Sequence, residues 1–302
     1  MTTIGVVGLG AMGGRIAGRL LGQGNAVRGT NRTRAKADTL IAQGLLWCDN
    51  PRTTAQGSDV VISMVTDGDA LDKVTQGPDG ILAGLAPGSV YIDMSTVGPR
   101  ASRTLAERVA AHGATMLSAP VSGSVRAAEE GSLAIIVGGQ DGAFQRVEPM
   151  LRQLGSTVTF VGDPGHALLL KLAINISLAV QMLAFSEGVL LAEQGGVDRS
   201  VALEVMTHSA VGSPMLQARA ALLRELPGNA WFDVAMMQKD LRLALDYGRD
   251  EGLPMPSTSV ADQMLSTARA AGYEHRDIAV VFRVLSELAA VPVGGTPGSA
   301  TM

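Results

Sequence analysis

Short apolar runs alternate with helical patterns through the first half of the chain. The apolar runs lie at residues 4–7, 26–29, 60–64, 90–93, 115–117, 134–137 and 157–160. Runs of this length, separated by helical stretches, predict parallel strands that are joined by helical crossovers. We therefore expect the first half of the chain to form an α/β sheet that continues to about residue 162.

The strand pattern stops near residue 162, and helical patterns fill the rest of the chain. Residues 165–194 indicate one long helix. Further helical patterns follow, with breaks at the Gly and Pro residues 195–196, 212, 227–228 and 254–256. The second half is therefore expected to be all-helical.

The long helix is apolar enough to raise the question of a membrane span. It carries Lys171 in its first half and Glu187 in its second, and charged side chains inside a bilayer are costly. We therefore expect no membrane span. A helix that is apolar on most faces must be covered by protein instead, and one chain of this size leaves part of it uncovered. This predicts a homodimer or a homotetramer.

Composition narrows the classes of partner. Hydrophobic residues make up 46% of the chain and charged residues 17%, which is typical of a folded globular protein. Aromatic residues make up only 3% and the formal net charge is -4, so we expect no binding of nucleic acid or of anionic lipid. The single cysteine, Cys48, and the lack of a basic and apolar leader favour a cytoplasmic protein. The four histidines lack metal-ligand spacing, so no metal is expected.

A glycine-rich segment follows the first predicted strand and opens the first predicted helix. Its residues are Gly8, Leu9, Gly10, Ala11, Met12 and Gly13. This is the G-x-G-x-x-G pattern of dinucleotide sites, and its place between a strand and a helix makes it specific. The glycines permit a tight turn, close approach of a pyrophosphate and close helix packing, while the helix N-terminus offers N–H groups to the anion. The segment predicts a dinucleotide site.

The residues after the second predicted strand bear on the choice between NAD(H) and NADP(H). NAD-specific domains carry an Asp or Glu here, which binds the ribose 2′-hydroxyl. This chain has Asn31, Arg32, Thr33 and Arg34, without a carboxylate at that point. A guanidinium can stack on adenine or pair with a 2′-phosphate. Arg32, with Arg34 as a second candidate, therefore favours NADP(H) over NAD(H).

Five segments together resemble a known family, the β-hydroxyacid dehydrogenases, over nearly the full length of the chain. They are the glycine-rich segment at residues 8–13, Asp-Met-Ser-Thr at 93–96, Ala-Pro-Val-Ser-Gly-Ser at 119–124, Lys-Leu-Ala-Ile-Asn at 171–175 and Gln-Lys-Asp-Leu at 238–241. The resemblance implies an α/β Rossmann N-terminal domain, residues 1–162, and an all-α C-terminal domain for substrate binding and oligomerisation, residues 163–302. Residues 163–194 would form a long interdomain helix.

The resemblance also implies an activity, the transfer of a hydride between NADP(H) and a small β-hydroxy acid or semialdehyde. Ser122 and Gly123 lie in a turn whose hydroxyl and N–H groups suit a substrate carboxylate. Lys171 and Asn175 are one helical turn apart and share a face. Lys171 is expected to be the general acid and base, while Asn175 helps to hold the substrate oxygen.

Further residues are expected around the cofactor. The carboxyl ends of parallel strands bind ligands in such sheets. The residues predicted at those ends to line the cofactor cleft are Met64, Val65, Thr66 and Thr96. The resemblance places Lys239 near the nicotinamide and the substrate, where Asp240 would orient it.

Two departures from the family pattern leave the substrate open. Ser118 stands where the family often has Asp, and Ser124 stands where it often has a second Gly. Two other functions also stay open. One is an imine reductase, although such enzymes usually lack the pair of Lys171 and Asn175. The other is a non-catalytic NADP-binding protein.

Overall fold

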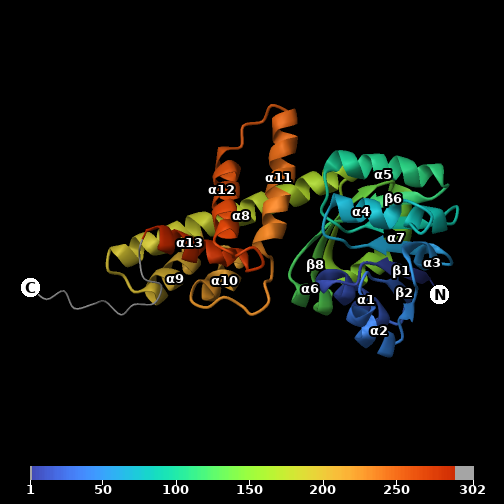
Figure 1. Ribbon diagram of the computed structural model, residues 1–302, viewed down its shortest axis with the longest axis horizontal. Helices are drawn as coiled ribbons and strands as arrows, with labels where there is room; N and C mark the ends of the chain where they lie inside the picture. Colours follow the sequence, from blue (N-terminus) through green and yellow to red (C-terminus); the bar gives the residue numbers. More distant parts are fainter. Residues whose placement is uncertain (1, 290–302) are drawn as a thin grey trace, which may run out of the picture. The chain divides into compact units, whose positions relative to one another are not determined.

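The structure, a computed structural model, describes residues 2–289 (Figure 1). Its internal contacts divide the chain into two compact units, and the division falls between Ala173 and Ile174. The first unit is a sheet with helices, and the second is helical over the residues that the structure describes. This confirms the predicted fold class. The last part of the predicted second domain, residues 290–302, lies outside the described residues.

A mixed sheet forms the centre of the first unit. Its strands are β1 (Thr3–Val7), β2 (Ala26–Thr30), β3 (Leu46–Trp47), β4 (Val60–Ser63), β5 (Val90–Asp93), β6 (Thr115–Ser118), β7 (Val121–Ser122), β8 (Leu133–Gly139) and β9 (Gly155–Phe160). The parallel part has the order β3-β2-β1-β4-β5-β6, which is the strand order of dinucleotide-binding sheets. β8 lies next to β6 but runs antiparallel to it, and β7 pairs with β8. The later strands therefore continue the sheet in mixed orientation, because the chain turns back beside β6.

Alternate side chains of the central strands build a core on each face of the sheet. Ile4 and Ile62 belong to the core that α1 and α7 cover, whereas Val61 and Tyr91 belong to the core that α4 and α5 cover. Figure 1 shows α1 and α5 on opposite sides of the strands. The helices of this unit are α1 (Ala11–Gly22), η1 (Arg34–Ala37), α2 (Asp38–Ala42), α3 (Pro51–Ala55), α4 (Gly68–Thr75), η2 (Ile81–Gly84), α5 (Pro99–Ala111), α6 (Val125–Glu130) and α7 (Asp141–Leu154).

One long helix, α8 (Pro164–Gln194), runs from the first unit into the second and confirms the predicted long helix. Of the helices within residues 2–289, α8 alone is long and apolar enough to cross a membrane; its most apolar window has a mean hydropathy of 1.9 and is 39% buried. The other elements of the helical unit are α9 (Arg199–His208), α10 (Pro214–Arg219), η3 (Ala220–Leu223), α11 (Val234–Asp250), α12 (Pro256–Ala270), η4 (Ile278–Val280) and α13 (Val281–Leu288).

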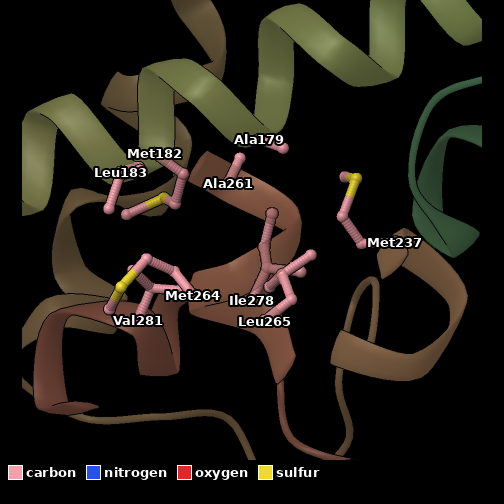
Figure 2. Close-up of a pocket in the computed structure, with 9 residues that line it drawn as sticks. All are labelled: Ala179, Met182, Leu183, Met237, Ala261, Met264, Leu265, Ile278 and Val281. Atoms are coloured by element: carbon pink, nitrogen blue, oxygen red, sulfur yellow. The ribbon is translucent and has the colours of Figure 1, made fainter. Parts of the chain in front are cut away.

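The core of the helical unit contains a cavity of about 10 Å³ (Figure 2). Its lining is wholly apolar and consists of Ala179, Met182, Leu183, Met237, Ala261, Met264, Leu265, Ile278 and Val281. A buried water needs polar partners, which these side chains do not offer. The cavity is therefore a packing gap among helices and not a candidate substrate site.

Candidate active site

The glycine-rich turn between β1 and α1 is closed by contacts between backbones. Gly8 has a positive φ of 96°, and its N–H donates to the carbonyl oxygen of Thr30 at 3.0 Å. A Cβ on Gly8 would stand 2.3 Å from the carbonyl oxygen of Met64, and one on Gly13 would stand 2.0 Å from the carbonyl oxygen of Gly8. These two positions therefore admit no side chain, because the neighbouring backbone already fills the space.

Gly10 differs, because a Cβ there would meet no atom within 4 Å. It is the N-cap of α1, its cap has no side-chain hydrogen bond, and the first turn of α1 has no acidic residue. The first N–H groups of a helix lack partners within the helix and carry partial positive charge. The open space and the uncapped N–H groups fit a bound pyrophosphate.

Asn31 stands directly after β2, where a carboxylate would indicate NAD(H). Its Oδ1 accepts a hydrogen bond from the N–H of Leu9 at 3.1 Å, and its Nδ2 donates to the carbonyl oxygen of Thr33 at 3.0 Å. Arg32 is exposed, whereas the guanidinium of Arg34 lies 5.5 Å from the ring centre of Trp47. Arg32 therefore exposes its charge to solvent beside the glycine-rich turn, while the guanidinium of Arg34 makes a cation–π contact with Trp47.

The ends of β4 and β5 carry the other residues predicted to line the cofactor site. Met64, Val65 and Thr96 are half-buried, and Thr66 is exposed. Met64 is the residue whose carbonyl oxygen faces Gly8, so the structure brings it to the glycine-rich turn. Beneath these residues lies a buried polar cluster, Ser63, Tyr91, Asp93 and Ser95, to which sequence reasoning assigned no role.

The Ser122 turn has a backbone that requires glycine. Ser122 ends β7 and is half-buried, and Gly123 has a φ of 144°. A Cβ on Gly123 would lie 2.8 Å from Cδ2 of Leu133, so the turn is fixed by space as well as by conformation. Ser124 is the N-cap of α6, and its Oγ accepts from the N–H of Ala127 at 3.2 Å. Its side chain therefore serves its own helix.

The other departure from the family pattern, Ser118, is equally well accommodated. Its hydroxyl lies 2.5 Å from that of Ser102, and both side chains are buried. Two hydroxyl groups satisfy each other here, so the position needs no charge.

The helical unit contributes a cluster around one buried carboxylate. The Nδ2 of Asn175, on α8, donates to Oδ2 of Asp240 at 2.6 Å, and Nζ of Lys239 lies 2.9 Å from Oδ1 of the same carboxylate. Asn175 is 1% exposed and Asp240 is 2% exposed. Lys171 lies one turn before Asn175 on α8 and is half-buried. The structure thus joins Asn175 and Lys239 through Asp240. Sequence reasoning had linked Asp240 only to Lys239, because the contact across 65 positions leaves no local trace.

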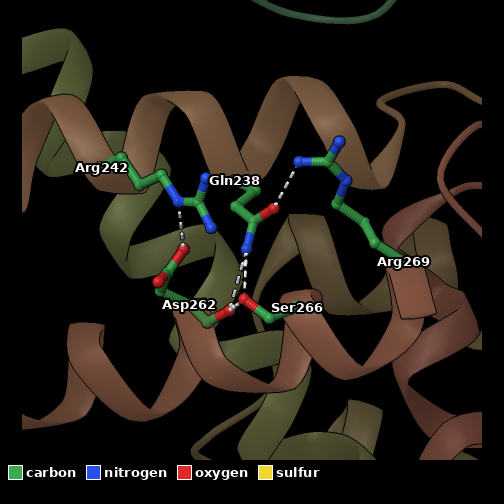
Figure 3. A network of polar contacts seen from close by, with 5 residues as sticks. All are labelled: Gln238, Arg242, Asp262, Ser266 and Arg269. Atoms are coloured by element: carbon green, nitrogen blue, oxygen red, sulfur yellow. Dashed lines mark hydrogen bonds and ion pairs between the residues drawn. The ribbon is translucent and has the colours of Figure 1, made fainter.

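A second buried polar contact fixes α11 next to these residues (Figure 3). Nε2 of Gln238 donates to Oγ of Ser266 at 2.7 Å and to the carbonyl oxygen of Asp262 at 3.2 Å. Its Oε1 accepts from Arg269 at 3.0 Å. Gln238 thus ties α11 to α12, while Asp240 ties it to α8. These two contacts set the rotation of α11 about its axis, and with it the direction of Lys239.

Two family models match the chain. The one described as the NAD binding domain of 6-phosphogluconate dehydrogenase matches residues 3–162. The one described as NAD-binding of NADP-dependent 3-hydroxyisobutyrate dehydrogenase matches residues 165–285.

Several curated relatives match nearly the whole length of the chain. It is 31% identical to 2-(hydroxymethyl)glutarate dehydrogenase of Eubacterium barkeri, over 97% of this chain and 97% of that protein. It is 34% identical to 3-hydroxyisobutyrate dehydrogenase of Pseudomonas aeruginosa, over 92% of this chain and 96% of that protein. It is also 31% identical to the cytokine-like nuclear factor N-PAC of Xenopus tropicalis, over 93% of this chain and 52% of that protein.

Solved structures agree in fold. The 3-hydroxyisobutyrate dehydrogenase of Mycobacterium tuberculosis with L-serine has a TM-score of 0.84 and 29% identity, over 94% of this chain and 99% of that one. A protein named Psf3, in complex with NADP+ and 2-OPP, has a TM-score of 0.86 and 30% identity, over 94% of this chain and 100% of that one. An imine reductase of a Pseudomonas species shares the fold, with a TM-score of 0.62 and 23% identity, over 94% of this chain and 99% of that one.

The family models cover nearly all of the described residues, and the strand order and the glycine-rich turn agree with them. The chain belongs to the β-hydroxyacid dehydrogenases, a family of NAD(P)-dependent dehydrogenases and reductases.

Proposed function

We propose that the chain transfers a hydride between NADP(H) and a small β-hydroxy acid or the corresponding semialdehyde, with Lys171 as general acid and base. The observation that carries the proposal is the pair of Lys171 and Asn175 on one face of α8, where buried Asp240 fixes the amide of Asn175. A fixed amide can hold a substrate oxygen at one place beside an ammonium group. Proton transfer requires this arrangement.

Each side chain then has a defined task. In the reducing direction, the ammonium of Lys171 donates a proton to the carbonyl oxygen of the substrate; in the oxidising direction, its neutral amine accepts the alcohol proton. The amide nitrogen of Asn175 has two N–H donors, and the bond of one to Asp240 sets the direction of the other. Lys239 balances the charge of Asp240. The bound nicotinamide supplies or accepts the hydride.

The substrate carboxylate is assigned to the turn at Ser122 and Gly123. The hydroxyl of Ser122 and the backbone N–H groups of the turn can donate to a carboxylate. The names of two relatives agree with a small acid as substrate, since they refer to 2-(hydroxymethyl)glutarate and 3-hydroxyisobutyrate. The identity of the acid depends on the side chains that contact the part of the substrate beyond its carboxylate.

The nucleotide is assigned to the glycine-rich turn and to the residues after β2, β4 and β5. The N–H groups at the start of α1 would hold the pyrophosphate, and Arg32 would bind the 2′-phosphate of NADP(H). Two observations support NADP(H) over NAD(H): Asn31 stands in place of a carboxylate, and a structural relative at 30% identity is named as a complex with NADP+. Val65, Thr66 and Thr96 would face the nicotinamide half.

Two alternatives are tested by the same assay. Imine reductases share this fold at a lower TM-score than the relatives that act on hydroxy acids. N-PAC bears the name of a nuclear factor and no enzyme name, which keeps a non-catalytic protein as the second alternative.

The experiment follows NADPH absorbance with glyoxylate, succinic semialdehyde, methylmalonate semialdehyde and a cyclic imine. We expect oxidation of NADPH with at least one semialdehyde, and a kcat about a thousandfold lower in Lys171→Ala with an unchanged Kd for NADPH. Turnover of the imine alone would replace the proposal by the first alternative. Binding of NADPH without turnover of any compound would favour the second. Tighter binding of NADH than of NADPH would contradict the cofactor assignment.

Oligomerisation and a cytoplasmic location stay predictions. Self-association is supported by apolar side chains at the surface of the helical unit, among them Leu191, which is 77% exposed, and Val201 and Val205 on α9, which are 50% and 62% exposed. Val201 and Val205 lie one helical turn apart and share a face. Light scattering that gives a monomer mass at micromolar concentration would contradict the predicted dimer or tetramer.

A further inference from the structure

The ends of β4 and β5 are joined by a buried carboxylate. Ser63 and Asp93 are register partners on these two strands. The hydroxyl of Ser63 donates to Oδ1 of Asp93 at 2.7 Å, and the backbone N–H of Ser95 donates to the same oxygen at 3.1 Å. Ser63, Asp93 and Ser95 are each at most 1% exposed. The carboxylate therefore gathers donors from both strands at the edge where the sheet binds ligands.

The direction of this hydrogen-bond chain follows from Tyr91. Its hydroxyl lies 2.7 Å from Oγ of Ser63. Burial, and then the charge of Asp93, raise the pKa of Tyr91 well above its ordinary value, so the phenol keeps its proton. Because Ser63 donates its one hydroxyl proton to Asp93, its oxygen accepts from the hydroxyl of Tyr91. The hydrogen bonds among these side chains therefore run in one direction, from Tyr91 through Ser63 to Asp93, and this favours a single arrangement of the three side chains.

This hydrogen-bond network connects the two loops that are assigned to the cofactor. Oγ of Ser95 accepts a hydrogen bond from the backbone N–H of Val65 at 3.0 Å. Val65 and Thr66 lie in the loop after β4, while Ser95 and Thr96 lie in the loop after β5. One side chain therefore ties the first loop to the second, and Asp93 holds the backbone from which that side chain extends.

We propose that Ser95 and Asp93 are positioning residues for nucleotide binding, which hold the loops after β4 and β5 at a fixed separation so that Val65, Thr66 and Thr96 meet the nicotinamide half together. The inference rests on the proposed function, since it takes these loops as part of the nucleotide site. Neither side chain needs to touch the nucleotide, because each acts through the loop backbone.

The test compares two losses of a buried serine hydroxyl in the same unit. Ser95→Ala removes the tie between the loops. Ser58→Ala is the matched control: Ser58 is 4% exposed and its Oγ donates to the carbonyl oxygen of Thr54 at 2.7 Å, before β4 and away from the loops. We expect both variants to lower Tm by similar amounts. We expect Ser95→Ala to raise the Kd for NADPH about tenfold (about 1.4 kcal/mol), while Ser58→Ala changes it less than twofold.

Two further variants keep the test decisive. Asp93→Ala removes the oxygen that accepts from Ser63 and from the N–H of Ser95, so we expect it also to raise the Kd for NADPH about tenfold. If Ser95→Ala does not fold, Ser63→Ala replaces it and is expected to raise the Kd about threefold (about 0.65 kcal/mol). A wild-type chain that binds NADPH, with an unchanged Kd in the Ser95 or Ser63 variant, overturns this inference alone. A wild-type chain that binds neither NADPH nor NADH overturns the proposed function as well.

Discussion

The two units build their candidate functional groups in different ways. In the first unit the group consists mainly of backbone: a turn closed between Gly8 and Gly13, and N–H groups at the start of α1. In the helical unit the group consists of buried side chains, in which Asp240 contacts both Asn175 and Lys239. A backbone site is set by which side chains are absent, so glycine spacing reveals it. A side-chain site is set by which helices pack together, and spacing alone does not show that.

The largest expected effect comes from filling the backbone site. In Gly13→Ala the new Cβ would lie 2.0 Å from the carbonyl oxygen of Gly8, so the turn must shift. We expect a loss of about 3 kcal/mol in the free energy of unfolding. Affinity for NADPH should fall about a hundredfold, which corresponds to about 2.7 kcal/mol. Chemical denaturation and fluorescence titration measure the two quantities.

Gly10→Ala is the control for Gly13→Ala, because a Cβ at Gly10 meets no protein atom within 4 Å. The free energy of unfolding should change by less than about 0.5 kcal/mol, whereas NADPH binding should weaken, since the methyl group enters the space assigned to the pyrophosphate. An equal loss in the free energy of unfolding in the two variants would show that Gly10 is also packed against the protein. It would contradict the distinction between these two glycines.

The next effect comes from the side-chain site. Asp240→Asn keeps the shape of the side chain but removes the charge that pairs with Lys239. We expect kcat to fall about thirtyfold, because the single oxygen of the new amide can accept from Asn175 or from Lys239 but not from both, so the amide of Asn175 is no longer fixed in one direction. The Kd for NADPH should stay within twofold of the wild type. A Kd that rises along with the fall in kcat would mean that the carboxylate acts on nucleotide binding.

A smaller effect is expected where α11 meets α12. Gln238→Met keeps the volume of the side chain but loses the hydrogen bonds to Ser266, Asp262 and Arg269 (Figure 3). The free energy of unfolding should fall by about 2 kcal/mol, and kcat should fall about fivefold, because Lys239 follows the rotation of α11. Arg242→Met is the control, since its ion pair with Asp262 is half-exposed and worth at most about 1 kcal/mol. If both variants lose activity equally, the rotation of α11 is not the cause.

The smallest effect is a pH dependence at the start of α8. Burial raises the pKa of Asp163, but the hydrogen bonds from the N–H of Gly165 and from Arg103 outweigh it and leave the pKa below its ordinary value of 3.8. A lowered folded-state pKa stabilises the fold above the ordinary pKa, and this stabilisation is lost as the pH falls through the folded-state value. The Tm difference between the wild type and Asp163→Asn should therefore shrink from pH 5 to pH 3. A difference that stays constant over this range would contradict the assignment.

Local patterns were enough to predict the parallel strands, the long helix and the glycine-rich turn, because each depends on neighbours in sequence. The antiparallel direction of β8 was not expected, since apolar runs show where strands lie but not how they pair. Asp93 and Ser95 were noticed only as part of a family-like segment; their hydrogen bonds with Ser63 were not predicted, because a polar residue inside a strand becomes informative only once its neighbouring strand is known. Asp240 was noticed as half of a charged pair, but its bond to Asn175 depends on the packing of α8 against α11.

The two hydrogen bonds of Asn31 bear on attempts to change cofactor preference. The usual route to an NAD-using variant would place a carboxylate at this position. Here the side chain also accepts from the N–H of Leu9 and donates to the carbonyl oxygen of Thr33. A carboxylate could keep the first bond but would repel the second partner. Redesign should therefore begin at the exposed Arg32 and leave Asn31 in place, so that specificity is altered without loosening the turn that every nucleotide must use.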